Sequence, residues 1–285
     1  MKKILITGKD SYIGTSLEKW LLKDPDQYQV DTVDMIDPSW KEKDFSPYDV
    51  VFHVAGIAHV KETKQNRDLY FKVNRDLAFE TARKAKAEGV TYFIFLSSMS
   101  VYGLEKGVIQ ESTIPNPRTA YGKSKLEAEN LLNSLTEDSF AVAILRPPMV
   151  YGKGCKGNYP RLAKLATKIP VFPKMNNKRS MVYIDNLTEF LRYVIDHEIS
   201  GQLFPQNREY VNTIELVELI AKTHGKKIHA TKLLNPFAKL GIKLSGTVSK
   251  VFGTLVYETS MKGSPGIECE YEEIPFAESV ERTET

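Results

Sequence analysis

The feature that most constrains the fold is an alternation of short apolar segments with amphipathic ones through the first 150 residues. Five short segments are predicted as strands: residues 2–7, 28–34, 48–55, 91–97 and 140–146. The third is almost continuously apolar, as a parallel strand covered on both faces is. Three segments between the predicted strands carry apolar side chains at helical spacing: residues 12–23, 74–88 and 121–135. Strands that alternate with helices are joined by right-handed crossovers, so this pattern predicts an α/β fold with a doubly wound parallel sheet.

The turn after the first strand predicts a dinucleotide site. It reads Thr7-Gly-Lys-Asp-Ser-Tyr-Ile-Gly14 and lies between a strand and a helix, where backbone N–H groups and a helix N-terminus meet a pyrophosphate. Glycine at the first position permits the tight turn, and glycine at the last permits close contact between helix and strand. An ordinary strand-to-helix turn is the alternative interpretation. The predicted cofactor-binding residues of the turn are Gly8, Ser11, Tyr12, Ile13 and Gly14.

Asp34 predicts which nicotinamide cofactor the site prefers. It ends the second strand, where a carboxylate accepts hydrogen bonds from the ribose hydroxyls of NAD and repels the 2′-phosphate of NADP. Asp31 and Asp37 compete for this role, and Lys41 and Lys43 follow closely. The sequence therefore favours NAD(H) slightly and leaves NADP(H) open.

Tyr121 and Lys125 predict a proton-transfer pair, because residues four apart lie on one face of a helix. A phenol loses its proton near pH ~10, and a cation one turn away lowers that pKa. The pair is therefore suited to moving a proton at an alcohol or ketone oxygen. Ser98 follows the strand at residues 91–97, at the sheet edge where ligands bind, and its hydroxyl is placed to bond the same oxygen. A solvated helix start and an ordinary turn are the alternative interpretations.

Composition excludes several other classes of protein. The chain has 39 Lys and Arg against 36 Asp and Glu, a net charge of +3, so no strong attraction to nucleic acid or membrane is expected. Cys155 and Cys269 form neither a disulfide framework nor a metal pattern, which fits a cytoplasmic protein. The first apolar segment is too short for a membrane span. Residues 239–250 mix lysine with apolar residues and are interpreted as a solvated face, with an amphipathic segment that associates with a membrane as the alternative.

The character of the chain changes after residue 150, where glycine and proline interrupt the pattern. We therefore predict a dinucleotide-binding domain at residues 1–150. A smaller, discontinuous substrate-binding lobe is predicted at residues 151–285, packed on the carboxyl edge of the sheet. The tail at residues 260–285 is acidic and lacks periodicity, so it is expected to be loosely ordered.

Five motifs in order carry a family resemblance: Thr7-Gly8…Gly14, His53-Val-Ala55-Gly56, Ser97-Ser98…Val101-Tyr102-Gly103, Tyr121…Lys125 and Arg146-Pro147-Pro148…Val150-Tyr151-Gly152. The chain resembles the extended short-chain dehydrogenases/reductases, the family of nucleotide-sugar epimerases, dehydratases and reductases. It departs from the family at Ser11, which stands where the family has the middle glycine of its first motif. A hydroxyl there adds a contact to the pyrophosphate or crowds it.

The resemblance implies a Rossmann fold and a role for each matched residue. Tyr121 would protonate the C4 oxygen of a sugar, Lys125 would lower the pKa of Tyr121 and bond the nicotinamide ribose, and Ser98 would hold the carbonyl oxygen. The other implied cofactor-side residues are Ala55, Gly56 and Asn74, the last of which is also interpreted as a helix N-cap. The other implied substrate-side residues are Asn158 and Arg179. His59 follows the third strand at a position that could face the sugar, with a structural role as the alternative, and His53 is interpreted as a core histidine.

Within the family, the chain most resembles bacterial reductases that finish UDP-linked 6-deoxy-N-acetylhexosamines for capsule and O-antigen. The matching segments are 146–152, 155–158, 173–180 and 251–257. This resemblance implies NAD(P)H-dependent reduction of the C4 keto group of a UDP-linked 4-keto-6-deoxy (N-acetyl)hexose. Two alternatives stay open, a UDP-hexose 4-epimerase with tightly bound NAD and a non-catalytic NAD(P)-binding sensor. The family further implies a homodimer through a four-helix interface formed by residues 74–88 and 121–135.

Overall fold

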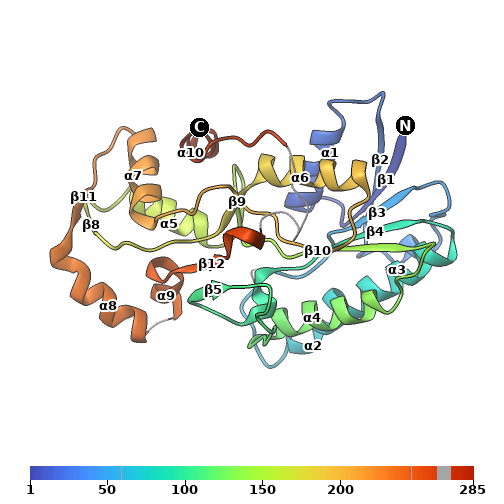
Figure 1. Cartoon of the computed structure of the whole chain (residues 1–285), viewed down its shortest axis with the longest axis horizontal. Helices are drawn as coiled ribbons and strands as arrows, with labels where there is room; N and C mark the ends of the chain where they lie inside the picture. The colour runs from blue at the N-terminus through green and yellow to red at the C-terminus, as the bar shows by residue number, and fades with distance from the viewer. Residues whose placement is uncertain (59, 245, 262–270) are drawn as a thin grey trace.

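A six-stranded parallel sheet organises the computed structural model, which describes residues 1–58, 60–244, 246–261 and 271–285 (Figure 1). Its strand order is β10-β6-β4-β3-β1-β2, and every neighbouring pair is parallel. The strands are β1 (Lys2–Thr7), β2 (Tyr28–Val33), β3 (Val50–His53), β4 (Tyr92–Leu96), β6 (Ala141–Leu145) and β10 (Gly201–Leu203). The predicted fold class is confirmed.

The chain reverses its winding direction beside β1. It passes from β1 to β2 on one side and then to β3 on the other, so the carboxyl ends of β1 and β3 border the switch point where such sheets bind ligands. Thr7 is in register with His53 at these two ends. The turns that begin at Gly8 and Val54 therefore lie next to each other.

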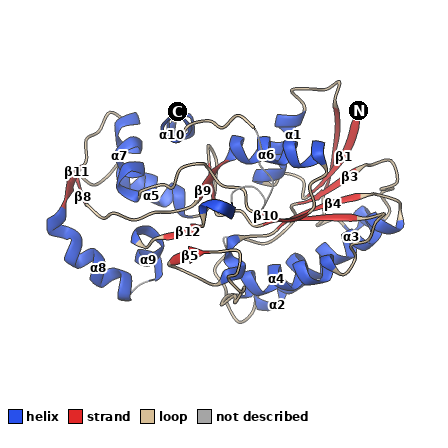
Figure 2. Cartoon of the chain, viewed as in Figure 1, coloured by secondary structure: helices blue, strands red, loops and turns tan. Residues whose placement is uncertain are grey.

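Helices cover both faces of the sheet (Figures 1 and 2). Helices α1 (Tyr12–Leu21) and α6 (Ile184–His197) lie on one face, and α3 (Leu77–Ala87) and α4 (Ala120–Asn133) on the other. Successive strand residues point to opposite faces, so Ile4 and Ile6 of β1 join one hydrophobic cluster and Leu5 joins the other. Because helices cover both faces of the sheet, all four residues of β3 are buried. The same cover explains why the sequence of this strand is almost continuously apolar.

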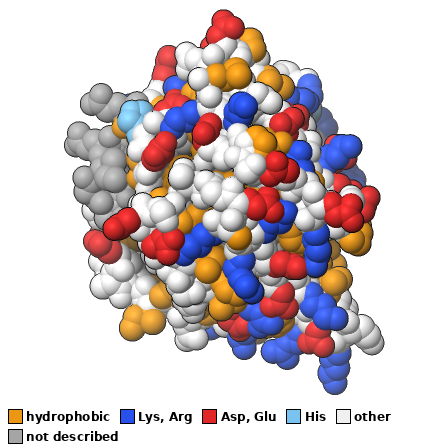
Figure 3. All heavy atoms as spheres, turned by 90° about the vertical axis from the view of Figure 1, so that its right-hand side faces the viewer, with side chains coloured by type: hydrophobic (Ala, Val, Ile, Leu, Met, Phe, Trp, Pro, Cys, Tyr) orange, Lys and Arg blue, Asp and Glu red, His pale blue; other side chains and the backbone are white. Residues whose placement is uncertain are grey.

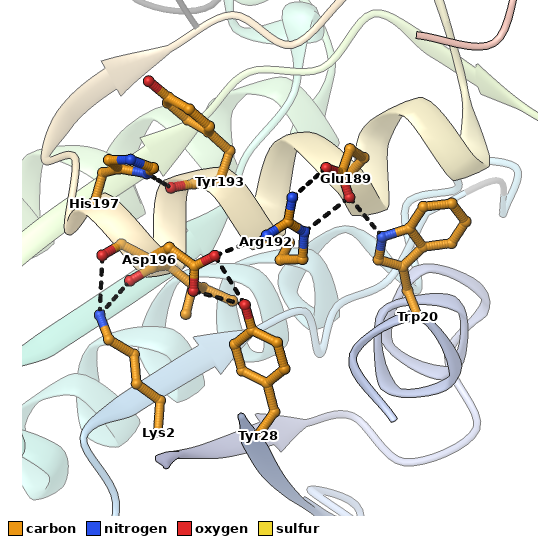
Figure 4. A network of polar contacts seen from close by, with 9 residues as sticks. Lys2, Trp20, Tyr28, Glu189, Arg192, Tyr193, Asp196 and His197 are labelled. Carbon is orange, nitrogen blue, oxygen red and sulfur yellow. Dashed lines mark hydrogen bonds and ion pairs between the residues drawn. The ribbon is translucent and has the colours of Figure 1, made fainter. Parts of the chain in front are cut away.

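Polar side chains attach α6 to the first strands of the sheet (Figure 4). The Tyr28 hydroxyl donates to Asp196 at 2.7 Å, and Trp20 Nε1 donates to Glu189 at 2.8 Å. Arg192 bonds both of these carboxylates from the same helix. Helix α6 and strand β10 both come from beyond residue 150, so the sheet and its covering layer draw on both predicted lobes.

The second lobe is built from small parallel pairs and short helices, at the left of Figure 1. Its strand pairs are β5 (Gly107–Ile109) with β12 (Leu255–Tyr257), β7 (Met149–Tyr151) with β9 (Met181–Tyr183), and β8 (Val171–Pro173) with β11 (His229–Thr231). Its helices are α5 (Asn158–Ala166), α7 (Thr213–Thr223), α8 (Asn235–Leu244) and α9 (Gly246–Phe252). Because β5 comes from the first half of the chain and pairs with β12, it connects the second lobe to that half.

The helix expected to begin at residue 74 begins earlier. Helix α2 (Arg67–Phe71) runs into a π-helical segment (Lys72–Asp76) and then into α3. Asn74 is therefore inside a continuous helical stretch, and its interpretation as an N-cap is wrong. A π turn shifts the register of the side chains, so the apolar spacing that marks α3 does not extend back through it.

The C-terminal tail is ordered where the structure describes it, and the expectation of a loose tail is wrong there. Helix α10 (Phe276–Glu284) packs beside α7, with Val280 fully buried. The Ser279 and Tyr151 hydroxyls lie 2.6 Å apart. The helix is short and mostly polar, so one buried face was too weak a signal to outweigh the acidic composition. Residues 262–270 lie outside the described part of the chain.

The surface carries charges of both signs. Acidic and basic side chains are interspersed over the face shown in Figure 3. In the part of the chain that the structure describes, no helix combines the length and apolar character that crossing a membrane requires.

Replacing Val280 with alanine tests whether α10 belongs to the folded core. The change removes two buried methyl groups, so we expect the free energy of unfolding to fall by about 2 kcal/mol. Chemical denaturation measures this. Glu281→Ala, on the exposed side of the same helix, should change stability by less than about 0.5 kcal/mol. Equal stability of Val280→Ala and the unmodified chain would show that the helix does not contribute to the core.

Candidate active site

The turn after β1 has the shape that a pyrophosphate-binding turn needs. Gly8 has φ of +95°, and a Cβ on it would lie 2.9 Å from the backbone nitrogen of Ala55. A Cβ on Gly14 would lie 2.5 Å from Ser11 Oγ and 3.1 Å from side-chain carbons of Ile6 and Val54. Only glycine therefore fits at either position, and the N-terminus of α1 is held against the ends of β1 and β3. These residues fit a dinucleotide.

Ser11, which replaces the family's middle glycine, caps the helix that follows. Its Oγ accepts a hydrogen bond from the backbone N–H of Gly14 at 3.3 Å. Capping satisfies one of the N–H groups that α1 would otherwise leave unpaired. Tyr12 and Ile13 form the first turn of α1 behind it, and the buried Tyr12 hydroxyl has no partner among the described residues. The serine is thus accommodated without distortion of the helix start.

Asp34 lies directly after β2 and is exposed. Its Oδ1 accepts from the backbone N–H of Ile36 at 2.8 Å, which holds the carboxylate at the end of the strand. The two competing carboxylates have other roles. Asp31 accepts from the Tyr48 hydroxyl, and Asp37 caps the short helix at Pro38–Lys41. The geometry thus favours Asp34 as the residue that contacts a ribose.

Asn74 ties the loop after β3 to α4. It is fully buried, its Oδ1 accepts from Ile57 N–H at 2.8 Å, and its Nδ2 donates to Ser124 Oγ at 3.1 Å. A Cβ on Gly56 would lie 2.9 Å from Asn74 Oδ1 and 3.3 Å from Lys125 Nζ. Gly56 is therefore needed for this close approach, with Ala55 buried beside it. The π-helical segment that carries Asn74 is of a kind often found at functional sites.

Lys125 is buried beneath this loop. Its Nζ donates to the carbonyl oxygen of Leu96 at 2.7 Å and lies 4.5 Å from the centre of the Phe95 ring. Burial lowers the pKa of Lys125 to about 7, and Glu129 opposes the shift. The amine is therefore only partly charged at neutral pH.

Tyr121 is partly exposed in the first turn of α4. The Thr119 side chain caps that turn, and the Tyr70 ring meets the Tyr121 ring edge-on at 6.4 Å. Burial raises the pKa of Tyr121, and a hydrogen bond with the Ser98 side chain lowers it by less. This direction is opposite to the one predicted from the Tyr–Lys spacing, because Lys125 bonds Leu96 and is itself partly neutral.

Ser98 begins the short helix at Met99–Tyr102, and its Oγ accepts from Ser100 N–H at 3.1 Å. The end of β4 and the start of α4 thus bring Ser98 and Tyr121 together, with Lys125 one turn further along α4. The three predicted catalytic residues therefore lie close together. Their chemical roles stay predictions.

Two predicted substrate-side residues belong to the second lobe. Arg179 is half-buried, its Nη1 donates to the Gly253 carbonyl at 3.0 Å, and burial lowers its pKa to about 10. Among the described residues no carboxylate forms an ion pair with it, which leaves the cation suited to an anionic ligand. Asn158 is exposed at the first residue of α5. His59 lies outside the described residues.

A buried ion pair behind the site was missed in the sequence. Glu129 Oε2 lies 2.5 Å from Arg146 Nη2, and Glu129 also accepts from the Ser97 hydroxyl. Arg146 Nη1 donates to the Tyr102 hydroxyl at 2.8 Å. The available signal was spacing, since Glu129 follows Lys125 by four residues on the buried side of α4.

His53 is a buried core histidine, as interpreted from the sequence. Its Nδ1 lies 2.8 Å from Thr7 Oγ1, and its Nε2 has no partner among the described residues. Burial, with a contribution from Lys125, lowers the pKa of His53 to about 3, so the ring is neutral. His53 is the last residue of β3, and its ring stacks with Phe93 and Phe95 of β4.

Comparison with known proteins assigns the family. The model of the NAD dependent epimerase/dehydratase family matches residues 4–204, which span the sheet, the glycine turn and the Ser98–Tyr121–Lys125 group. The chain belongs to this family. Membership agrees with the resemblance carried by the five motifs.

Two relatives align over most of the chain. UDP-glucose 4-epimerase of Vibrio cholerae is 34% identical over 290 residues, covering 91% of this chain and 88% of that protein. N-acetyl-alpha-D-glucosaminyl-diphospho-ditrans,octacis-undecaprenol 4-epimerase of Escherichia coli O157:H7 is 27% identical over 273 residues, covering 88% and 81%.

Solved structures share the fold. UDP-glucuronic acid 4-epimerase from Bacillus cereus, in complex with UDP-glucuronic acid and NAD, has a TM-score of 0.73 at 22% identity and covers 99% of this chain and 97% of that one. RMD from Pseudomonas aeruginosa, complexed with NADPH, has a TM-score of 0.75 at 18% identity and covers 99% and 98%.

The lowered pKa of Lys125 predicts a pH-dependent stability. The unfolded chain holds this proton up to about pH 10.4, whereas the folded chain holds it only up to about pH 7. Between these values the unfolded state binds more protons, so the free energy of unfolding rises with pH. Lys125→Met removes this contribution. Its stability advantage over the unmodified chain should shrink by about 2 kcal/mol from about pH 7.5 to about pH 9.5.

Denaturation at the two pH values measures the difference, and exposed Lys106→Met is the matched control. A difference between Lys125→Met and the unmodified chain that does not vary with pH would mean that Lys125 is not desolvated as described.

Proposed function

We propose that this protein transfers a hydride between a nicotinamide cofactor and C4 of a UDP-linked hexose. The observation that carries the proposal is the convergence of Ser98, Tyr121 and Lys125 beside the switch point of the sheet. A proton must move at the C4 oxygen whenever a hydride moves at C4. Ser98 and Tyr121 are both partly exposed, whereas Lys125 is buried, and the phenol is the group of the three suited to that role.

Ser98, Tyr121 and Lys125 each have a separate role at the sugar. The Ser98 hydroxyl orients the C4 oxygen, and Tyr121 gives it a proton or takes one from it. Burial keeps Tyr121 protonated at neutral pH, so it begins a reduction as the acid. Lys125, with its lowered pKa, lies one turn away and can exchange a proton near neutral pH. A bound nicotinamide supplies or accepts the hydride.

Arg179 and Asn158 are proposed to hold the diphosphate of the substrate. The guanidinium has a backbone carbonyl partner and no carboxylate partner in the described part of the chain, so its charge is available to an anion. A charge-assisted contact of this kind contributes about 1.5–3 kcal/mol. Holding the diphosphate in the second lobe would position the sugar over Tyr121, and such positioning accounts for much of the rate in two-substrate chemistry.

Two net reactions use this same site. Reduction of a 4-keto-6-deoxy (N-acetyl)hexose is supported by the resemblance of segments 146–152 and 173–180 to the bacterial 4-keto reductases of surface polysaccharide synthesis. Epimerisation at C4, with NAD retained, is supported by the two relatives that align over most of the chain, both 4-epimerases. A non-catalytic sensor is disfavoured because the serine, tyrosine and lysine are all present.

A pair of assays separates these reactions. A reductase consumes NADH or NADPH in equal amount to a UDP-4-keto-6-deoxy-N-acetylhexosamine. An epimerase interconverts UDP-glucose and its C4 epimer without net change in the cofactor. In either case Tyr121→Phe should lower kcat by about 10²–10⁴-fold, because the proton donor is lost while the ring remains.

Tyr193→Phe on α6 makes the same chemical change away from the site and should leave kcat unaltered. Full activity of Tyr121→Phe on the correct substrate would remove Tyr121 from the mechanism.

The position of Asp34 predicts the choice of cofactor. Its carboxylate repels a 2′-phosphate, so we expect tighter binding of NAD than of NADP. Asp34→Ala should lower the ratio of the NADP to the NAD dissociation constant by about tenfold, equivalent to about 1.4 kcal/mol of lost repulsion and lost ribose bonding. Titration of each cofactor by fluorescence or calorimetry measures the ratio. Asp37→Ala is the control, and a larger shift in this control would reassign the ribose contact.

A further inference from the structure

Helix α8 presents an apolar stripe to solvent. Leu233 lies in the short 3₁₀ segment before it (Lys232–Leu234), and Phe237, Leu240 and Leu244 within it are spaced by three and four residues, which puts these three on one helix face. Their exposed fractions are 83%, 73%, 55% and 78%. Ala238 on another face is buried, so the helix packs on the lobe with its most apolar stripe outward. The earlier interpretation of residues 239–250 as a solvated face does not account for this stripe.

The two stretches of sequence that form α8 and the strand pair before it are basic, although the whole chain is close to neutral. Residues 139–184 contain nine Lys and Arg and no Asp or Glu, and residues 225–257 contain six Lys and no Asp or Glu. The parallel pair β8–β11 joins these two acid-free segments. The acidic residues that balance the net charge lie elsewhere in the chain.

Exposed lysines lie close to the stripe. Lys232 begins the 3₁₀ segment that leads into α8, Lys239 lies within α8, and both are exposed. The Asn235 side chain donates to the carbonyl oxygen of exposed Lys174 at 2.9 Å, which fixes the end of β8 against the start of α8. Long lysine side chains beside an exposed apolar stripe match an anionic bilayer surface, where the stripe enters the acyl boundary and the ammonium groups meet phosphate headgroups.

We propose that helix α8 and the lysines beside it dock this protein on the surface of a membrane that contains anionic lipid. A helix of ten residues is too short to span a bilayer but long enough to lie in its interface. Charge decides the occupant: a second copy would bring its own exposed lysines beside the stripe, Lys232 and Lys239, against those of the first, whereas anionic headgroups complement them. The docking surface belongs to the lobe that contains Arg179, so it would hold the diphosphate-binding side of the protein near the membrane. It does not depend on which C4 reaction the protein catalyses.

Vesicle flotation of the full chain tests this proposal. The probes are vesicles of phosphatidylcholine alone and vesicles that also contain phosphatidylglycerol. We expect binding to the anionic vesicles, at least about tenfold weaker binding to the neutral ones, and loss of binding as ionic strength rises. Phe237→Ser/Leu240→Ser should weaken binding to anionic vesicles by about tenfold or more, and Lys232→Glu/Lys239→Glu should do the same.

Ile114→Ser is the matched control, because it removes an exposed apolar side chain outside the patch. All variants should keep the circular dichroism spectrum and the cofactor affinity of the unmodified chain. Absence of binding to anionic vesicles, equal binding to neutral ones, or an equal loss in Ile114→Ser would overturn the proposal. So would a change from dimer to monomer, by light scattering, confined to Phe237→Ser/Leu240→Ser, because a second copy would then be the occupant.

Discussion

The arrangement of the site depends on the buried pair of Glu129 and Arg146. Two charges removed from water are stable only when their geometry is good and their remaining hydrogen-bonding groups are satisfied. Here Ser97 and Tyr102 complete the pair, from the end of β4 and the helix that follows it. Loss of either charge would leave the other buried and unpaired, at a cost of about 3–5 kcal/mol. The pair therefore fixes α4 against the strand end that carries Ser98.

The same network reaches the second lobe. The Tyr257 hydroxyl of β12 donates to the Arg146 carbonyl at 2.8 Å, and the Tyr257 ring packs against Tyr102. Strand β12 in turn pairs with β5 and lies next to Arg179, through the bridge to Leu255. One chain of contacts thus joins α4, which carries the proton-transfer pair, to the lobe that carries the proposed diphosphate contact. Distances between the two halves of the site are set by packed groups, not by a flexible linker.

Sequence reasoning succeeded where one local pattern determines the structure. Period and composition predicted β1, β2, β3, β4 and β6 but not the three-residue edge strand β10. The glycine turn was predictable because Gly8 and Gly14 meet strand ends that admit no side chain. It failed where several distant segments act together. The inward side of Glu129 depends on Arg146, and the role of Asn74 depends on a π segment that shifts the helix register. The predicted direction of the Tyr121 pKa shift was wrong for the same reason. Spacing places Lys125 near Tyr121, but burial decides the charge of Lys125.

The net charge of the whole chain does not describe the local charge that a binding partner would meet. A value of +3 suggests no electrostatic partner, yet two acid-free segments are joined in the fold by β8 and β11. Screening limits each charge to about 8–10 Å at physiological ionic strength, so a surface responds to the charges near it and not to the sum. The fold therefore brings two basic stretches, distant in the sequence, side by side at β8 and β11. Contiguous exposed apolar surface marks an interaction site. Contact with an anionic membrane surface would explain the apolar stripe of α8, whereas exposure to water alone would not.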